Sequence, residues 1–147
     1  MSLQSWWKNG WLTEHQTSPQ EIANLLAVAD RDLADCRTPG LSADWRLNIA
    51  YNAALQAATA ALYASSYRAA REMHHYRTIQ SLAFTLGADS AVVGQLDQFR
   101  KKRNIGGYER AGLVSDQEAD EMIALDLRLK HMIENWLHEN HPALLGG

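Results

Sequence analysis

Only three prolines interrupt this chain of 147 residues, and they leave long stretches that contain no helix breaker. Pro19, Pro39 and Pro142 all stand where a helix would begin or end. Alanine, leucine, glutamine, arginine and glutamate dominate the stretches between them, and these residues are strong helix formers. No segment shows the period-2 alternation typical of a half-buried strand, and there is no internal repeat. The sequence therefore predicts an all-α fold.

Capping signals and apolar periodicity divide the chain into five helical segments. The first begins at Ser18, where Glu21 completes a capping box and Pro19 takes the first helical position. A second capping box, formed by Ser115 and Glu118, begins the last segment. The expected segments run from Ser18 to before Thr38, over about 42–66, about 72–86 and about 89–105, and from Ser115 to before Pro142.

Two further features indicate how these helices pack. Gly87 is suited to end the third segment, and its short loop folds the third and fourth segments into an antiparallel hairpin. The second segment carries many alanines, which permit a neighbouring helix, or a second copy of the chain, to approach closely. We expect an up-and-down bundle of four or five helices.

The chain divides into a tryptophan-rich N-terminal arm over residues 1–17, a helical bundle over 18–142 and a short tail over 143–147. Trp6, Trp7 and Trp11 make the arm too apolar for a free tail. The arm is expected to pack over the bundle, and the alternative is a docking patch for a partner protein.

Composition and charge narrow the classes of function. Apolar residues form 46% of the chain and charged residues 21%, which excludes a wholly disordered protein. The net charge of -3 argues against a protein that coats nucleic acid over its whole surface. A single cysteine, Cys36, excludes an internal disulfide framework, and no apolar run is long enough to span a bilayer. We expect a cytoplasmic protein with no membrane contact.

The sharpest local feature is the basic run Arg100-Lys101-Lys102-Arg103 at the end of the fourth segment. Four cations at a helix C-terminus complement the helix dipole, so a solvated helix end is one interpretation. However, Arg103 continues the apolar stripe of Val92, Leu96 and Phe99, and a cation on a buried edge needs a carboxylate or an external anion. The two glycines that follow allow Tyr108 to fold back toward Arg103.

The residues from Phe99 to Glu109, Phe-Arg-Lys-Lys-Arg-Asn-Ile-Gly-Gly-Tyr-Glu, resemble the Arg-Asn-x-x-x-Tyr/His signature of the HEPN (higher eukaryotes and prokaryotes nucleotide-binding) superfamily. The segments 50–55 and 74–82 resemble the second and third helices of small bacterial HEPN proteins, and the resemblance covers about residues 18–140. It implies a helical bundle, usually a homodimer, that binds a nucleotide or RNA. It also implies a nucleotidyltransferase partner and a role in toxin–antitoxin or stress and defence systems.

In the ribonuclease branch of that superfamily, an arginine and a histidine form a metal-independent site that is duplicated across the dimer. Arg103 and Asn104 match this pattern, but Tyr108 stands where the histidine would be. A phenol with a pKa of about 10 is only roughly 0.1% ionised at pH 7, so it is a poor general base. The resemblance therefore gives Arg103, Asn104 and Tyr108 as phosphate-binding candidates and leaves catalysis open.

The predicted hairpin offers a replacement for the missing imidazole. Folding about Gly87 and Ala88 brings His74 or His75 within about a turn of Arg103, where either could act as a general base. The alternative is that these histidines are polar residues at a helix start or hydrogen-bond donors to Tyr108. Arg71 and Arg77, together with Arg100 and Arg103, would add to a basic crevice suited to a phosphate-bearing ligand.

Other candidate sites are weaker. Glu134, His138 and His141 could gather a metal from one helix face, but Pro142 breaks the helix beside them. Cys36 has no paired base in the sequence, so we expect an inert thiol. We expect neither a metal nor a cofactor. Three functions stay open: a nucleotide- or RNA-binding module, a metal-independent endoribonuclease that uses Arg103 with His74 or His75, and a structural or partner-binding protein with no ligand.

Overall fold

The computed structural model of the chain describes residues 1–105 and 114–146, with only the backbone at 104 and 105. Its elements are mostly helical, which confirms the prediction of an all-α helical bundle. In chain order they are α1 (Leu3–Lys8), β1 (Leu12–Glu14), α2 (Pro19–Asp35), α3 (Ala43–Ala64), β2 (Tyr67–Ala69), α4 (His74–Gln80), α5 (Leu82–Thr85), α6 (Ser90–Ile105), α7 (Asp116–Asn140) and the short 3-10 helix η1 (Pro142–Leu145).

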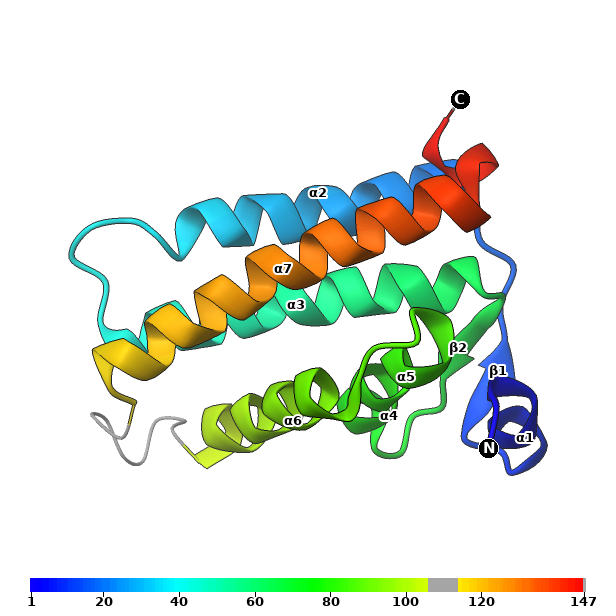
Figure 1. Ribbon diagram of the computed structural model, residues 1–147, viewed down its shortest axis with the longest axis horizontal. Helices are drawn as coiled ribbons and strands as arrows, with labels where there is room; N and C mark the ends of the chain where they lie inside the picture. The colour runs from blue at the N-terminus through cyan, green and yellow to red at the C-terminus, as the bar shows by residue number, and fades with distance from the viewer. Residues whose placement is uncertain (106–113, 147) are drawn as a thin grey trace.

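Helix α3 is the centre of the bundle. Helices α2 and α7 run along it on one side, and α4 to α6 lie against it on the other (Figure 1). A helix with neighbours on several sides must be apolar nearly all round, and the alanines of α3 between residues 50 and 64 are all buried. The close packing predicted from these alanines is confirmed, and it takes place within one chain. None of the described helices is both long and apolar enough to cross a bilayer.

Serine caps begin three of the long helices. Ser42 Oγ accepts a hydrogen bond from the backbone N–H of Trp45, and Ser115 and Glu118 form both halves of the predicted capping box. At the start of α2, Ser18 caps Glu21 as predicted, but the second half of that box is absent. The Glu21 carboxylate instead lies 2.6 Å from His15 Nε2 and accepts a bond of 2.8 Å from the Thr17 hydroxyl. These stronger side-chain partners replace the backbone N–H of Ser18.

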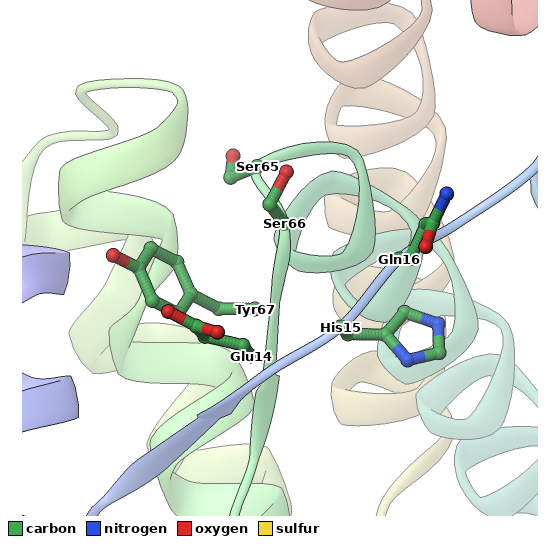
Figure 2. A pocket seen from close by; sticks show the side chains of 6 residues that line it. All are labelled: Glu14, His15, Gln16, Ser65, Ser66 and Tyr67. Atoms are coloured by element: carbon green, nitrogen blue, oxygen red, sulfur yellow. The ribbon is translucent and has the colours of Figure 1, made fainter.

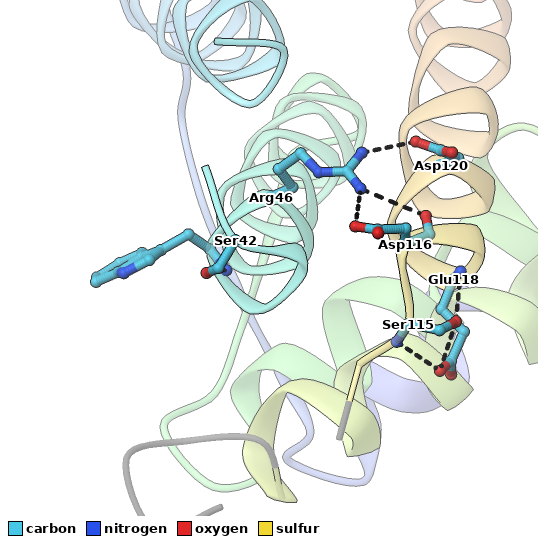
Figure 3. A network of polar contacts seen from close by, with 7 residues as sticks. Ser42, Arg46, Ser115, Asp116, Glu118 and Asp120 are labelled. Carbon is cyan, nitrogen blue, oxygen red and sulfur yellow. Dashed lines mark hydrogen bonds and ion pairs between the residues drawn. The ribbon is translucent and has the colours of Figure 1, made fainter. Parts of the chain in front are cut away.

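One end of α7 is fixed to α3 by charged groups. Arg46 of α3 donates to Asp120 over 2.6 Å and to Asp116 over 2.8 Å, close to the Ser115–Glu118 cap (Figure 3). Both carboxylates are largely exposed, so each ion pair adds no more than about 1 kcal/mol. The arrangement orients the first turn of α7 more than it stabilises the bundle.

Two short strands correct the expectation that the chain has none. β1 and β2 pair antiparallel, with Leu12 opposite Ala69 and Glu14 opposite Tyr67. Each strand has only three residues, which is too short for a period-2 pattern to be recognised in the sequence. Left-handed backbone at Ser66 (φ 74°) turns the chain from α3 into β2.

The N-terminal arm packs over the end of the bundle through a second core cluster. Its buried members are Trp6, Leu12, Leu62 and Ala69. The ring of Trp6 meets the ring of Phe84 edge to face, with 5.1 Å between their centroids. The interpretation of the arm as a packed segment is therefore confirmed, although Trp7 remains 39% exposed.

The third predicted segment, 72–86, is not one continuous helix. It forms α4 and α5, with a break at the wholly buried Ser81. The hydroxyls of Thr78 and Ser81 donate to the carbonyls of His74 (2.8 Å) and Thr78 (2.6 Å), and such bonds compete with regular helical geometry. The predicted hairpin is confirmed: Gly87 turns the chain with φ +67°, and α4 and α5 pack against α6.

Candidate functional site

Two of the groups predicted for the basic crevice, Arg103 and His75, lie near each other where the C-terminal half of α6 and the first turn of α4 meet α3, and we keep the name crevice for this place. The guanidinium carbon of Arg103, in the last turn of α6, lies 5.0 Å from the centroid of the Tyr51 ring. Tyr51 belongs to α3 and is 1% exposed. The arginine thus continues the buried stripe, as its spacing predicts, and stacks on an aromatic ring.

His75 enters the same crevice from α4. The centroids of the His75 and Tyr51 rings are 6.4 Å apart, so Arg103 and His75 both neighbour one tyrosine. Partial burial, followed by the charges of Arg103, His74 and Arg100, lowers the pKa of His75. Its imidazole is therefore neutral at pH 7 and can accept a proton. The His74 ring lies next to it, with 5.8 Å between centroids.

The two arginines of α6 differ in their partners. Arg100 donates from Nε to Asp97 over 2.8 Å, and its guanidinium lies 5.3 Å from the Tyr76 ring centroid. No carboxylate among the described residues forms an ion pair with Arg103. Within the described residues, Arg103 therefore has more N–H donors available for an anion than Arg100 does.

Tyr51 also belongs to this crevice, although the sequence did not predict it as a site residue. Its hydroxyl is buried and has no hydrogen-bond partner within the described part of the chain. Burial raises the pKa of Tyr51 to about 12 against the opposing charges of Arg103 and Arg100, so the phenol stays protonated and able to donate. The one signal in the sequence was a tyrosine on an alanine-rich buried face, where a hydroxyl needs a partner.

A second hollow, which we call the Arg68/Arg71 pocket, lies on the β2 side of α4. It has a volume of about 570 Å³ and is lined by Thr13, Arg68, Ala69, Ala70, Arg71, His74 and His75. The predicted phosphate ligand Arg71 therefore lines this pocket, while Arg100 and Arg103 lie around Tyr51. His75 borders both places.

Arg77 does not join the crevice, contrary to the prediction. Its guanidinium lies 3.8 Å from the ring centroid of Trp11 and 5.5 Å from that of Trp6. The tryptophan-rich arm offers two π faces at this point, and they hold the cation at the arm. Arg77 thus fastens the arm to α4.

A third pocket, of about 510 Å³, is lined by polar residues from β1, the end of α3 and β2. In Figure 2 Glu14 and Tyr67 lie side by side, and His15 points away on the other side of the strand. His15 is already bound to Glu21 and lies against the Tyr63 ring, with 4.2 Å between centroids. The Ser65 hydroxyl donates to the Ala61 carbonyl. These groups do not converge on one point, so we assign no chemistry to this pocket.

Other candidates from the sequence have ordinary surroundings or lie outside the described structure. The side chain of Asn104 and the whole of Tyr108 are outside the described residues. Within residues 1–105 and 114–146, no three His, Cys, Asp or Glu side chains are placed to hold a metal ion. The ring of His141 packs on that of Trp136, with 4.9 Å between centroids. Cys36 is buried, and burial raises the pKa of its thiol to about 11, so it is no nucleophile.

Comparison with known proteins adds no relative to this picture. No family model, no curated protein and no solved structure matches the chain. Function is therefore inferred from the chemistry of the side chains around Tyr51.

Proposed function

We propose that this protein is a binding module for a nucleotide or RNA and that it holds a phosphate group of that ligand in the crevice around Tyr51. The observation that carries the proposal is the stacking of Arg103 on the ring of Tyr51. A guanidinium without a carboxylate partner in the described chain stacks on a phenol whose buried hydroxyl also lacks a partner. A phosphate group would satisfy the N–H donors of Arg103, and it would reach the buried Tyr51 hydroxyl only once the side chains that cover it move aside.

The neighbouring groups support a phosphate in preference to a carboxylate ligand. Arg100 adds a second positive charge on the same side of α6, and His75 adds a ring N–H that can donate. A phosphate presents several oxygens to such a set of donors, whereas a carboxylate presents two. The resemblance to HEPN domains adds Asn104 and Tyr108 to the proposed ligand contacts and suggests that the phosphate belongs to a nucleotide or RNA.

Binding measurements on Arg103→Ala test this proposal. Fluorescence anisotropy with a labelled single-stranded RNA, and calorimetry with AMP, should show affinity reduced by about tenfold or more, as expected when a charge-assisted hydrogen bond is removed. Lys101→Ala is the matched control, because Lys101 is an exposed cation of the same run. Unchanged binding together with a loss of about 1–3 kcal/mol in unfolding free energy would assign Arg103 a structural role instead.

A metal-independent endoribonuclease is the second candidate, and the lowered pKa of His75 favours it. In such a reaction the neutral imidazole would take the proton of a 2′-hydroxyl, which attacks the adjacent phosphorus as the bond to the 5′-oxygen breaks, and the leaving 5′-oxygen would take a proton from water to become a hydroxyl. Arg103 would stabilise the negative charge that develops on the phosphate. The groups of this reaction are the same ones that bind the ligand in the first proposal.

The resemblance also suggests an assembly, which we propose as a homodimer that works with a nucleotidyltransferase in a cytoplasmic toxin–antitoxin or defence system. The alanines of α3 are already buried within one chain, so a dimer must use another surface. Light scattering on the purified protein would measure the mass directly. A monomer at micromolar concentration would contradict the homodimer and leave the phosphate site unaffected.

A further inference from the structure

The Arg68/Arg71 pocket gathers positive charge without the acidic partners that most proteins place beside it. Both arginines are exposed, and none of the described carboxylates forms an ion pair with either one. Elsewhere in the chain Arg46 pairs with Asp116 and Asp120. Unpaired like charges that share a concave surface repel one another, so their grouping favours an anionic ligand.

The walls of the pocket suit a phosphate group. Ala69 and Ala70 form the part between the two arginines, and their small side chains let a ligand approach the backbone closely. Thr13, which pairs with Arg68 across the two strands, brings a hydroxyl beside Arg68. His74 completes the donor set from α4, and no acidic residue lines the pocket. Guanidinium and hydroxyl groups bind phosphate oxygens in nucleic-acid complexes, and the ring N–H of a histidine can donate to them as well.

The pocket is connected to the crevice around Tyr51 through one residue. His75 lines the pocket, and its ring also neighbours Tyr51 beneath Arg103. A ligand that passes His75 would therefore meet Arg103 on one side and Arg68 with Arg71 on the other. A mononucleotide with one phosphate can occupy only one of these places.

We infer that the Arg68/Arg71 pocket is a second phosphate subsite and that the ligand of the protein is single-stranded RNA, whose consecutive phosphates occupy the two places. This inference rests on the proposed function of the Arg103 crevice. It assigns roles in binding to Arg68, Arg71 and Thr13, and it places His75 beside the nucleoside that links the two bound phosphates.

The test compares three ligands on four proteins. Binding of AMP, of ATP and of a labelled RNA pentanucleotide is measured with wild type, the double variant Arg68→Ala/Arg71→Ala, Arg103→Ala and the control Arg128→Ala. Arg128 is an exposed arginine on α7, so it controls for the general loss of positive charge. Arg68 and Arg71 are exposed as well, and thermal melting of each variant checks that the fold is unchanged.

We expect the double variant to bind the pentanucleotide at least about tenfold more weakly and AMP with unchanged affinity. Its slope of log affinity against log salt for the RNA should fall by about 0.7 for each phosphate that the variant no longer binds. Arg103→Ala should weaken the binding of both ligands, and Arg128→Ala should leave the binding of both unchanged.

Three results would overturn the second subsite. If the double variant binds RNA like wild type while Arg103→Ala binds it weakly, the proposed function stands and the subsite does not exist. If the double variant loses as much affinity for ATP as for RNA, the pocket binds the polyphosphate of one nucleotide and not the next phosphate of a strand. Absence of binding of all three ligands to wild type would overturn the proposed function itself, and the subsite with it.

Discussion

Arg103 and Tyr51 lie on different helices, and the guanidinium of Arg103 is 5.0 Å from the centre of the Tyr51 ring. The ring covers one face of the cation, an interaction that contributes about 0.5–2 kcal/mol when it is partly desolvated. Stacking leaves the N–H groups at the edge of the guanidinium free to bind. The arrangement thus orients Arg103 without neutralising it, as an anion-binding arginine requires.

Tyr51→Phe separates the ring of this tyrosine from its hydroxyl. The buried hydroxyl has no partner among the described residues, and such a group costs about 1–3 kcal/mol. We expect the variant to be more stable than wild type without ligand by up to about 1 kcal/mol, and to bind RNA more weakly. Urea unfolding and anisotropy measure the two effects. A variant that loses stability and keeps its affinity would contradict a role of the hydroxyl in binding.

Asp126 of α7 is a buried carboxyl group near a second one. Asp126 is 2% exposed, and one of its carboxyl oxygens lacks a hydrogen-bond partner in the described structure. Burial raises the pKa of Asp126 to about 8 against the opposing charge of Arg37, and the charge of Asp32 raises it further. Asp32 itself accepts hydrogen bonds from Asn52 (2.6 Å) and from its neighbour Arg31.

The stability of the fold should therefore fall as the pH rises through neutrality. Between the ordinary pKa of 3.8 and the raised value of about 8, Asp126 holds a proton in the folded state and releases it on unfolding. Its contribution is most favourable below about pH 4, declines as the pH rises from 4 to 8, and is constant above. Asp126→Asn should remove this decline and raise the unfolding free energy at pH 8 by on the order of 2–4 kcal/mol.

Urea unfolding of wild type and Asp126→Asn at pH 5 and pH 8 measures this difference. The gap between the two proteins should be wider at pH 8 than at pH 5. Glu139→Gln is a suitable control, since Glu139 is an exposed carboxylate on the same helix. A gap that does not change with pH would show that Asp126 keeps an ordinary pKa.

Arg77→Ala tests the attachment of the N-terminal arm. Arg77 lies over Trp11 at 3.8 Å and within 5.5 Å of Trp6, so the substitution removes its stacking on two tryptophans. We expect a loss of about 1–2 kcal/mol in unfolding free energy. The tryptophan emission should also move to longer wavelength as the arm loosens. Arg77→Lys keeps the charge and loses the planar stacking group, so it should fall between wild type and alanine.

The endoribonuclease alternative predicts cleavage of RNA in EDTA that both His75→Ala and Arg103→Ala abolish. Because the pKa of His75 lies below its ordinary value of 6.5, the rate should rise with pH to a plateau already reached at pH 7. His138→Ala controls for the loss of a histidine elsewhere. Cleavage that is equal in all three variants would indicate a contaminating nuclease. If no cleavage occurs between pH 6 and 9, the endoribonuclease is contradicted and the binding module is the function that is left.

The candidate site was predictable in part. The four-three-four spacing up to Arg103 predicts that this cation faces inward, and the hairpin about Gly87 predicts that His75 approaches it, because both follow from helix geometry and one short loop. The contact of Tyr51 with Arg103 could not be predicted from the sequence, because it depends on how α3 crosses the hairpin. The place of Arg77 could not be predicted either. Its position in the sequence suggests the crevice, but the packing of the arm places it against Trp6 and Trp11.

The sequence by itself determined the helices and most of their ends. Caps such as Ser18 and Ser115 act on backbone N–H groups three residues away, and apolar periodicity acts within a few turns, so both can be read locally. Only the tertiary structure decided the pairing of β1 with β2 and the contact between Arg103 and Tyr51. Each depends on groups far apart in the chain, which meet only after α3 has been covered by its neighbours.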